Sequence, residues 1–279
     1  MAAPACARRS TLIEVDRFGD VTRIKMGREY QGRVLYWTAA YLVDGLLIDT
    51  GCPHTAEELT RFLEGRHLKL VVNTHHHEDH VGANHLLQQQ FKIPIMASQE
   101  SAPLIGQSLR LLPYQELVWG YPVPTKVGIL PRQVETESHR FEVIGTPGHC
   151  PDHVALVETI KGWCFTGDLF ISREPKAMRP EEDIYEIARS MKKLVDLPPE
   201  KLTLFTGLGN VVEDGRAALQ SCIQYIRSLS LKARALERQG LSPGTMVNEI
   251  FGRESVLAGL TDGHISSENV VRALLRPQS

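Results

Sequence analysis

The chain has 279 residues, of which 31 are Lys or Arg and 33 are Asp or Glu, so its formal net charge is -2. This balance excludes a nucleic-acid binder held by bulk positive charge, and no apolar run reaches the ~18 residues that a membrane-spanning helix needs. The opening stretch MAAPACARRSTL has no apolar segment after its two arginines, so we expect no secretory signal. The five cysteines are scattered without a CxxC pair, which predicts reduced thiols in a cytoplasmic protein.

The first hundred residues alternate between strand patterns and helix patterns. We predict strands at 33–43 and 45–48, a helix after Thr55, a strand at 68–72, a helix at 83–90 and a strand at 93–97. Asp44-Gly45 is typical of a two-residue hairpin turn, and Thr55 with Glu58 has the spacing of a capping box. Gly65 stands where a glycine that ends a helix is expected.

The remaining chain contains an irregular stretch, further strands and a helical tail. Five prolines punctuate residues 99–139, which we interpret as an insertion that is partly helical around 104–118. After it we predict strands at 140–144, 154–158, 163–166 and 202–205, and a helix at 184–195. From about residue 213 the pattern is helical. We therefore expect an α/β domain over residues 1–212 and a helical extension over residues 213–279 packed on it.

The strongest chemical signal is the run Thr74-His75-His76-His77-Glu78-Asp79-His80, which follows a predicted strand. In an extended segment residues two apart share a side, so His75 and His77 can converge, while Asp79 and His80 turn toward a second point. Such donors suit Zn²⁺, and also iron or manganese. The alternative interpretation of the run is a solvated, histidine-rich turn.

Two further pieces of sequence favour the metal site. Thr146-Pro147-Gly148-His149 follows one predicted strand, and Gly167-Asp168 follows another. A histidine and an aspartate that each end a separate strand are how ligands distant in sequence reach one site. The three pieces together therefore predict a metal-binding protein.

Together with Asp49-Thr50-Gly51, these motifs resemble the metallo-β-lactamase superfamily over roughly residues 12–210. The resemblance implies an αββα sandwich, in which two mixed β-sheets are flanked by helices, here with a C-terminal helical extension. It also implies six metal ligands: His75, His77 and His149 at a first metal, Asp79 and His80 at a second, and Asp168 as a bridge between them. The implied metal is zinc, one or two ions per chain, with iron or manganese as alternatives.

Two more residues are expected to support the site rather than to bind metal. By the resemblance, Asp49 orients a ligand histidine through a hydrogen bond, as metal-bound imidazoles usually require. A simple turn-forming role for Asp49 remains the alternative. His153 lies four residues after His149 and is expected to contact the ligands from behind.

The sequence departs from the family at one ligand. The family usually supplies a further histidine after the last strand of the domain, and here that turn reads Thr206-Gly207-Leu208-Gly209-Asn210. Neither Gly207 nor Leu208 can bind a metal through its side chain. His264 or His153 could fill the gap, although a local capping or packing role is the stronger interpretation of His264. We therefore predict one tight metal site and one weak or empty site.

The predicted function is that of a metal-dependent hydrolase. Its metal-activated water would attack an ester, thioester, lactone, amide or phosphoester bond of a small molecule, with Asp79 as the catalytic residue that orients the water. We expect no nucleic-acid or membrane partner, and the oligomeric state stays open. One alternative is a mononuclear iron oxygenase similar to the persulfide dioxygenases, with His75, His149 and Asp168 as the facial triad. Another is a non-catalytic relative with an incomplete second site.

Overall fold

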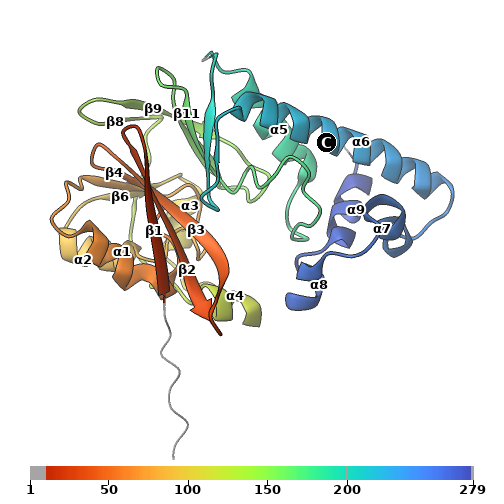
Figure 1. Ribbon diagram of the computed structural model, residues 1–279, viewed down its shortest axis with the longest axis horizontal. Coiled ribbons are helices and arrows are strands. Elements are labelled where there is room, and N and C mark those ends of the chain that lie inside the picture. The colour runs from red at the N-terminus through yellow and green to blue at the C-terminus, as the bar shows by residue number, and fades with distance from the viewer. Residues whose placement is uncertain (1–10, 199, 278–279) are drawn as a thin grey trace, which may run out of the picture. The chain divides into compact units, whose positions relative to one another are not determined.

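The computed structural model describes residues 11–198 and 200–277 (Figure 1). The contacts of the chain divide it into an N-terminal unit that ends at Leu130 and a C-terminal unit that begins at Pro131. Each unit contains one mixed β-sheet and its own helices. No helix within the described residues is long and apolar enough to cross a membrane.

The N-terminal unit is built on a seven-stranded sheet whose strands follow one another in chain order. They are β1 (Thr11–Phe18), β2 (Val21–Tyr30), β3 (Arg33–Val43), β4 (Leu46–Ile48), β5 (Leu70–Val72), β6 (Ile95–Ala97) and β7 (Gly128–Ile129). The first four pair antiparallel and the last four pair parallel. Asp44 and Gly45 both have positive φ and join β3 to β4, so the predicted two-residue hairpin is present.

The helices of this unit are η1 (Pro53–Thr55), α1 (Ala56–Leu63), α2 (Asn84–Phe91), α3 (Ser101–Ile105) and α4 (Pro113–Val118). Leu59 and Leu63 of α1 and Leu87 of α2 are fully buried against one face of the sheet. The predicted capping box at Thr55 was wrong. The short turn η1 precedes α1, and the Thr55 hydroxyl donates to the Cys52 carbonyl oxygen at 3.0 Å instead of capping the helix.

The C-terminal unit is built on a six-stranded sheet in the order β13-β12-β11-β10-β9-β8. Its strands are β8 (Gln133–Glu135), β9 (Arg140–Gly145), β10 (Val154–Glu158), β11 (Trp163–Gly167), β12 (Thr203–Thr206) and β13 (Val211–Val212). Only β11 and β12 pair parallel, because the helix between them carries the chain back across the sheet. The turns after β9 and β11 carry candidate site residues, and the turn after β12 contains Gly207 and Leu208.

Helices and sheet share one hydrophobic core in this unit. The helices are α5 (Ile184–Val195), α6 (Gly215–Arg238), α7 (Pro243–Phe251), α8 (Val256–Leu260) and α9 (Ser267–Leu275). The long helix α6 runs beside α5 (Figure 1), and Leu219 and Ile226 of α6 lie in the same core as Leu204 of β12 and Leu274 of α9. The helical tail is therefore continuous with the packing of the second sheet.

The predicted fold class, two mixed sheets with helices and a C-terminal helical region, is confirmed. The stretch 99–139, predicted as an irregular insertion, holds α3 and α4 and also supplies an edge strand to each sheet, β7 and β8. The predicted boundary between residues 212 and 213 stays a prediction.

Candidate metal centre

The histidine-rich run forms a buried loop after β5, at the carboxyl edge of the parallel strands. Because β4 and β5 are parallel, the segment that starts at Asp49 leaves the same edge. The two segments are joined by backbone hydrogen bonds, with Thr50 N–H donating to His80 O at 2.9 Å and Gly82 N–H to Gly51 O at 2.8 Å. The loop is consequently held from both sides by backbone contacts.

Two imidazole nitrogens of this loop have the spacing of ligands to one metal. His75 Nε2 and His77 Nδ1 lie 3.1 Å apart. Two nitrogens bound at 2.0–2.1 Å to a tetrahedral zinc would lie about 3.3 Å apart. His80 Nε2 lies 3.8 Å from Asp79 Oδ2, and the ring centroids of His75 and His80 are 4.1 Å apart. This donor set therefore fits a metal ion held by nitrogen and oxygen ligands.

The Asp49 carboxylate accepts hydrogen bonds from this loop. Its Oδ1 accepts from Thr74 N–H at 2.8 Å, and its Oδ2 lies 2.8 Å from both the Thr74 hydroxyl and His80 Nδ1. The hydrogen bond predicted between Asp49 and a candidate ligand histidine is therefore present. Asp49 adopts φ 59°, a conformation that Asp tolerates better than most residues.

These contacts select the nitrogen that each histidine can offer to a metal. The Thr74 hydroxyl donates its one hydrogen to Asp49, so it accepts from His75 Nδ1, which lies 3.0 Å away. His80 Nδ1 in turn donates to Asp49. In both rings the lone pair is therefore on Nε2, which is the nitrogen suited to metal binding.

Glu78, which stands between His77 and Asp79 in the sequence, is buried. Its Oε1 accepts from Gln115 Nε2 at 2.8 Å, and Gln115 belongs to α4. This hydrogen bond connects the histidine-rich loop to the stretch 99–139.

In the C-terminal unit, His149 and Asp168 lie on the turns after β9 and β11. His149 Nε2 is 3.7 Å from Asp168 Oδ2, while His149 Nδ1 is 2.5 Å from Glu182 Oε1. Burial lowers the pKa of His149, but the hydrogen bond and charge of Glu182 outweigh burial and raise it overall. Glu182 also accepts from Arg179 N–H at 2.6 Å. A buried carboxylate thus fixes this imidazole in the same way that Asp49 fixes His80.

Glu182 was not among the predicted site residues. The sequence shows it only as one of three acids near the start of a helix, where acids are common. Its contact with His149 spans 33 positions. No spacing rule in a single sequence links two such residues, so only the fold could reveal the pair.

Gly148 explains how His149 is placed. Its φ is 135°, and a Cβ at this position would lie 2.4 Å from the backbone nitrogen of Ile187. Gly148 O also accepts from Asp183 N–H at 2.8 Å. Because Asp183 is the N-cap of α5, the turn that carries His149 is fastened to the first turn of that helix.

His153 holds the Asp168 turn rather than supplying an extra ligand. Its Nδ1 lies 2.8 Å from the Thr146 hydroxyl, and its Nε2 accepts from Asp168 N–H at 3.2 Å. Both ring nitrogens are engaged, so His153 does not replace the missing histidine. His264 pairs with Glu181, with His264 Nε2 and Glu181 Oε2 3.4 Å apart.

The turn that lacks the usual histidine lies beside the Asp168 turn. Gly207 N–H donates to Gly167 O at 2.8 Å, and Thr206 Oγ1 accepts from Asn210 N–H at 3.0 Å. The backbone of the turn is thus formed, but Gly207 and Leu208 bring no donor side chain to it.

Cys150, next to His149, and Cys52, in the segment that follows Asp49, are not poised as nucleophiles. Burial is the main cause that raises the pKa of Cys150, assisted by the charge of Asp152, and burial also raises the pKa of Cys52 to about 11. Both thiols are therefore neutral near pH 7.

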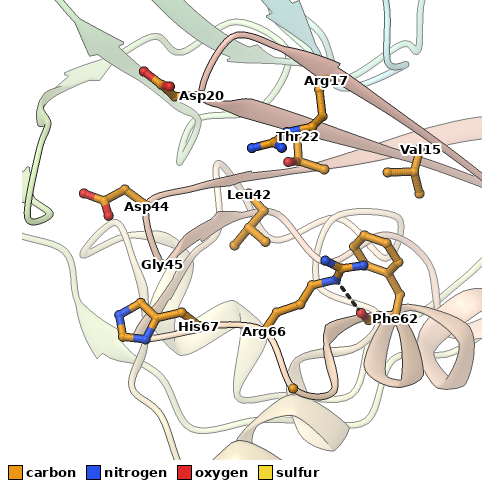
Figure 2. Close-up of a pocket in the computed structure, with 11 residues that line it drawn as sticks. Val15, Arg17, Asp20, Thr22, Leu42, Asp44, Gly45, Phe62, Arg66 and His67 are labelled. Carbon is orange, nitrogen blue, oxygen red and sulfur yellow. Dashed lines mark hydrogen bonds between the residues drawn. The ribbon is translucent and has the colours of Figure 1, made fainter.

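An open hollow of the N-terminal unit lies at the opposite edge of its sheet (Figure 2). Gly45 and His67, which precede β4 and β5, line it, whereas the ligand loop follows those strands. Arg66 lies over the Phe62 ring at 4.1 Å and donates to the Phe62 carbonyl oxygen at 2.8 Å, so it closes the end of α1. The hollow is separate from the candidate ligands.

The family model of the metallo-β-lactamase superfamily matches residues 38–205, which contain every predicted ligand. The chain belongs to this superfamily. Its predicted metal binding and metallo-hydrolase character are supported at the level of the superfamily, while the ligand roles of single residues remain predictions.

Its relatives include a protein of an insect and an enzyme of a bacterium. It is 26% identical over 220 residues to "Beta-lactamase-like protein 2 homolog" of Drosophila melanogaster, covering 72% of this chain and 68% of the relative. It is 33% identical over 133 residues to "Hydroxyacylglutathione hydrolase GloC" of Haemophilus influenzae, covering 44% of this chain and 59% of the relative. The match therefore spans less than two thirds of GloC.

Among solved structures, the fold is similar to that of a metallo-β-lactamase from Pontibacter korlensis. The TM-score is 0.61 at 20% identity, and the similarity covers 77% of this chain and 98% of the other. This likeness supports the fold.

Proposed function

We propose that this chain is a metal-dependent hydrolase whose metal is held by the residues that match the superfamily's ligands. These are His75, His77, Asp79, His80, His149 and Asp168. The observation that carries the proposal is that three candidate ligand imidazoles are each held by a hydrogen bond at Nδ1. Asp49, Thr74 and Glu182 each hold the Nδ1 atom of one candidate ligand histidine, which is the arrangement that orients metal-bound histidines.

Zinc is the metal that we propose, because the donors are imidazole nitrogens and carboxylate oxygens. When bound, such a metal would lower the pKa of a coordinated water so that hydroxide forms near neutral pH. Asp49 and Glu182 would keep the ligand imidazoles in their tautomers. Asp79 would orient the attacking water and accept its proton, and the burial of its carboxylate would keep competing water away.

For the bond that is cleaved, we propose a thioester or ester of a small molecule. The support is the 33% identity with GloC, whose name describes a hydroxyacylglutathione hydrolase. We propose a cytoplasmic location, and its support is that the four cysteines among the described residues are free thiols. We propose no nucleic-acid partner, since the net charge is -2.

The proposal is tested by metal content and hydrolysis measured on the same samples. The full chain is purified without a His-tag or chelator, and Zn, Fe and Mn per chain are measured by elemental mass spectrometry. Hydrolysis of a hydroxyacylglutathione thioester is followed alongside. We expect one to two zinc ions per chain and a loss of both metal and hydrolysis in His75→Ala.

The matched control for this test is His85→Ala, since His85 lies on α2 and is only partly buried. It should keep both metal and activity. About one iron per chain together with oxygen-dependent turnover would favour the oxygenase over the hydrolase. A protein that stays metal-free after reconstitution would overturn the proposal.

A further inference from the structure

The C-terminal unit contains a cavity of about 50 Å³ that begins at two residues of the candidate metal centre. Asp168, a candidate ligand, and Glu182, which holds His149, line one part of it. The cavity continues between α5, α6 and α9, the helices that share the core of this unit. Its position links the candidate metal centre to the helical tail.

Apart from these two acids and Ser172, the lining is made of nonpolar side chains and a thiol. Ile184 and Met191 of α5, Ile226 of α6 and Val270 of α9 contribute to it, and each is at most 3% exposed. Burial raises the pKa of Cys222, which also lines the cavity, to about 12, so its thiol is neutral. Charged or hydrogen-bonding ligand groups would therefore find no partners deep in the cavity.

The loop after Asp168 provides the exposed part of the lining. Ile171 is 41% exposed, whereas Ile184, Met191, Ile226 and Val270 of the helices are buried. An apolar side chain that stays exposed beside an apolar cavity is suited to contact with an apolar ligand at its mouth. The cavity thus has a nonpolar interior, an acidic end and a nonpolar rim.

We propose that this cavity binds the alkyl end of a short acyl chain, so that the substrate is an acyl ester or thioester with a nonpolar acyl group. This inference rests on the proposed hydrolase function. A reactive carbonyl near Asp168 would place the alkyl carbons among Ile184, Ile226 and Val270. Pockets for small molecules have this composition, with few polar groups at one end and apolar side chains elsewhere.

The size of the cavity sets the length of the chain. A water-sized group needs roughly 10–15 Å³ of such space, so the cavity accommodates about four methylene-sized groups. A pentanoyl or hexanoyl chain fits this space. A decanoyl chain would leave several carbons in solvent or force the helices apart.

The first experiment measures kcat/KM for a series of acyl-glutathione thioesters from acetyl to decanoyl. Burial of each added methylene should raise kcat/KM about fourfold up to hexanoyl, and kcat/KM should fall at decanoyl. Hydrolysis with no dependence on chain length would overturn the inference while leaving the hydrolase function in place.

Two matched variants of α6 locate the effect. Ile226→Ala enlarges the cavity and should move the optimum two or three carbons longer. Leu229→Ala removes a buried side chain from the same helix outside the lining, and it should keep the wild-type optimum. An equal shift in both variants would contradict the assignment.

A second readout is independent of hydrolysis. Hexanamide and acetamide, which are neutral, are titrated into the full-length protein with labelled isoleucine methyl groups, and NMR shifts are recorded. Hexanamide should perturb Ile184 and Ile226 while acetamide leaves them unchanged, and no perturbation by hexanamide would overturn the inference. If hexanamide binds but no thioester is hydrolysed, the cavity assignment stands and the proposed hydrolase function fails.

Discussion

The histidine-rich loop of the N-terminal unit and the turns that carry His149 and Asp168 in the C-terminal unit differ in how other residues hold them. His75 to His80 lie within six residues, and Asp49 and Thr74 hold them from neighbouring strand ends. His149 and Asp168 come from separate turns, and the carboxylate that holds His149 lies 33 positions further along the chain. The separation along the chain is similar in the two cases, since Asp49 and His80 are 31 positions apart. The first cluster lies in one loop that neighbouring parallel strands hold, whereas the second depends on the packing of α5. The two clusters should therefore respond differently to mutation.

The largest effect is expected from Gly148→Ala. A methyl group there meets the Ile187 backbone nitrogen at 2.4 Å in a conformation with φ 135°. Strain and overpacking together should lower the free energy of unfolding by about 3 kcal/mol or more. This corresponds to a Tm decrease of roughly 6–12 °C, measured by calorimetry.

Gly145→Ala is the control for this prediction, because a Cβ at Gly145 meets nothing within 4 Å. It should change Tm little. If Gly148→Ala is as stable as Gly145→Ala, the dependence of the second cluster on α5 is contradicted.

A smaller effect is expected from loss of the supporting carboxylates. Asp49→Asn and Glu182→Gln should each weaken metal affinity roughly 10- to 100-fold, measured by competition with a chelator. Asp49→Asn should have the larger effect, because its carboxylate accepts from the Thr74 amide, the Thr74 hydroxyl and His80. Glu186→Gln, on the exposed side of α5, should have no effect. An unchanged affinity in Glu182→Gln would remove Glu182 from the site.

The smallest effect is expected from supplying the missing histidine. Gly207→His or Leu208→His adds an imidazole to the turn beside Asp168, so the weaker metal should bind about tenfold tighter. Metal per chain after dialysis is the measurement, and Leu208→Phe is the control without a nitrogen donor. If neither histidine variant retains more metal than Leu208→Phe, this turn does not face the second metal.

The sequence predicted the fold class and the location of most elements because hydrophobic periodicity and turn residues are local signals. The bounds of α5 and the hairpin at Asp44-Gly45 were correct for this reason. The edge strands β7 and β8 were not predicted, since they have two and three residues and lie among prolines. The capping box failed because Thr55 bonds to Cys52 one turn earlier.

The candidate ligands were recognisable because they form short motifs after predicted strands. Of the two carboxylates that hold candidate ligand histidines, only one was recognised. Asp49 was found because it belongs to a short motif after a strand. Glu182 was missed because its role depends on where α5 packs, and that information is absent from the spacing of residues around it. The lack of a metal-binding side chain at Gly207 and Leu208 was visible in the sequence, because the identity of the two residues is enough to show it.

The division of the chain between Leu130 and Pro131 also has a consequence during synthesis on the ribosome. Each unit is continuous in sequence and has its own sheet, so the first can fold before the second has been made. Translation from His80 to Asp168 takes several seconds at roughly 5–20 residues per second. During that interval the nascent chain displays three histidines and an aspartate without their later partners. A cell that makes this protein thus presents a loop of candidate metal ligands before the rest of the polypeptide exists.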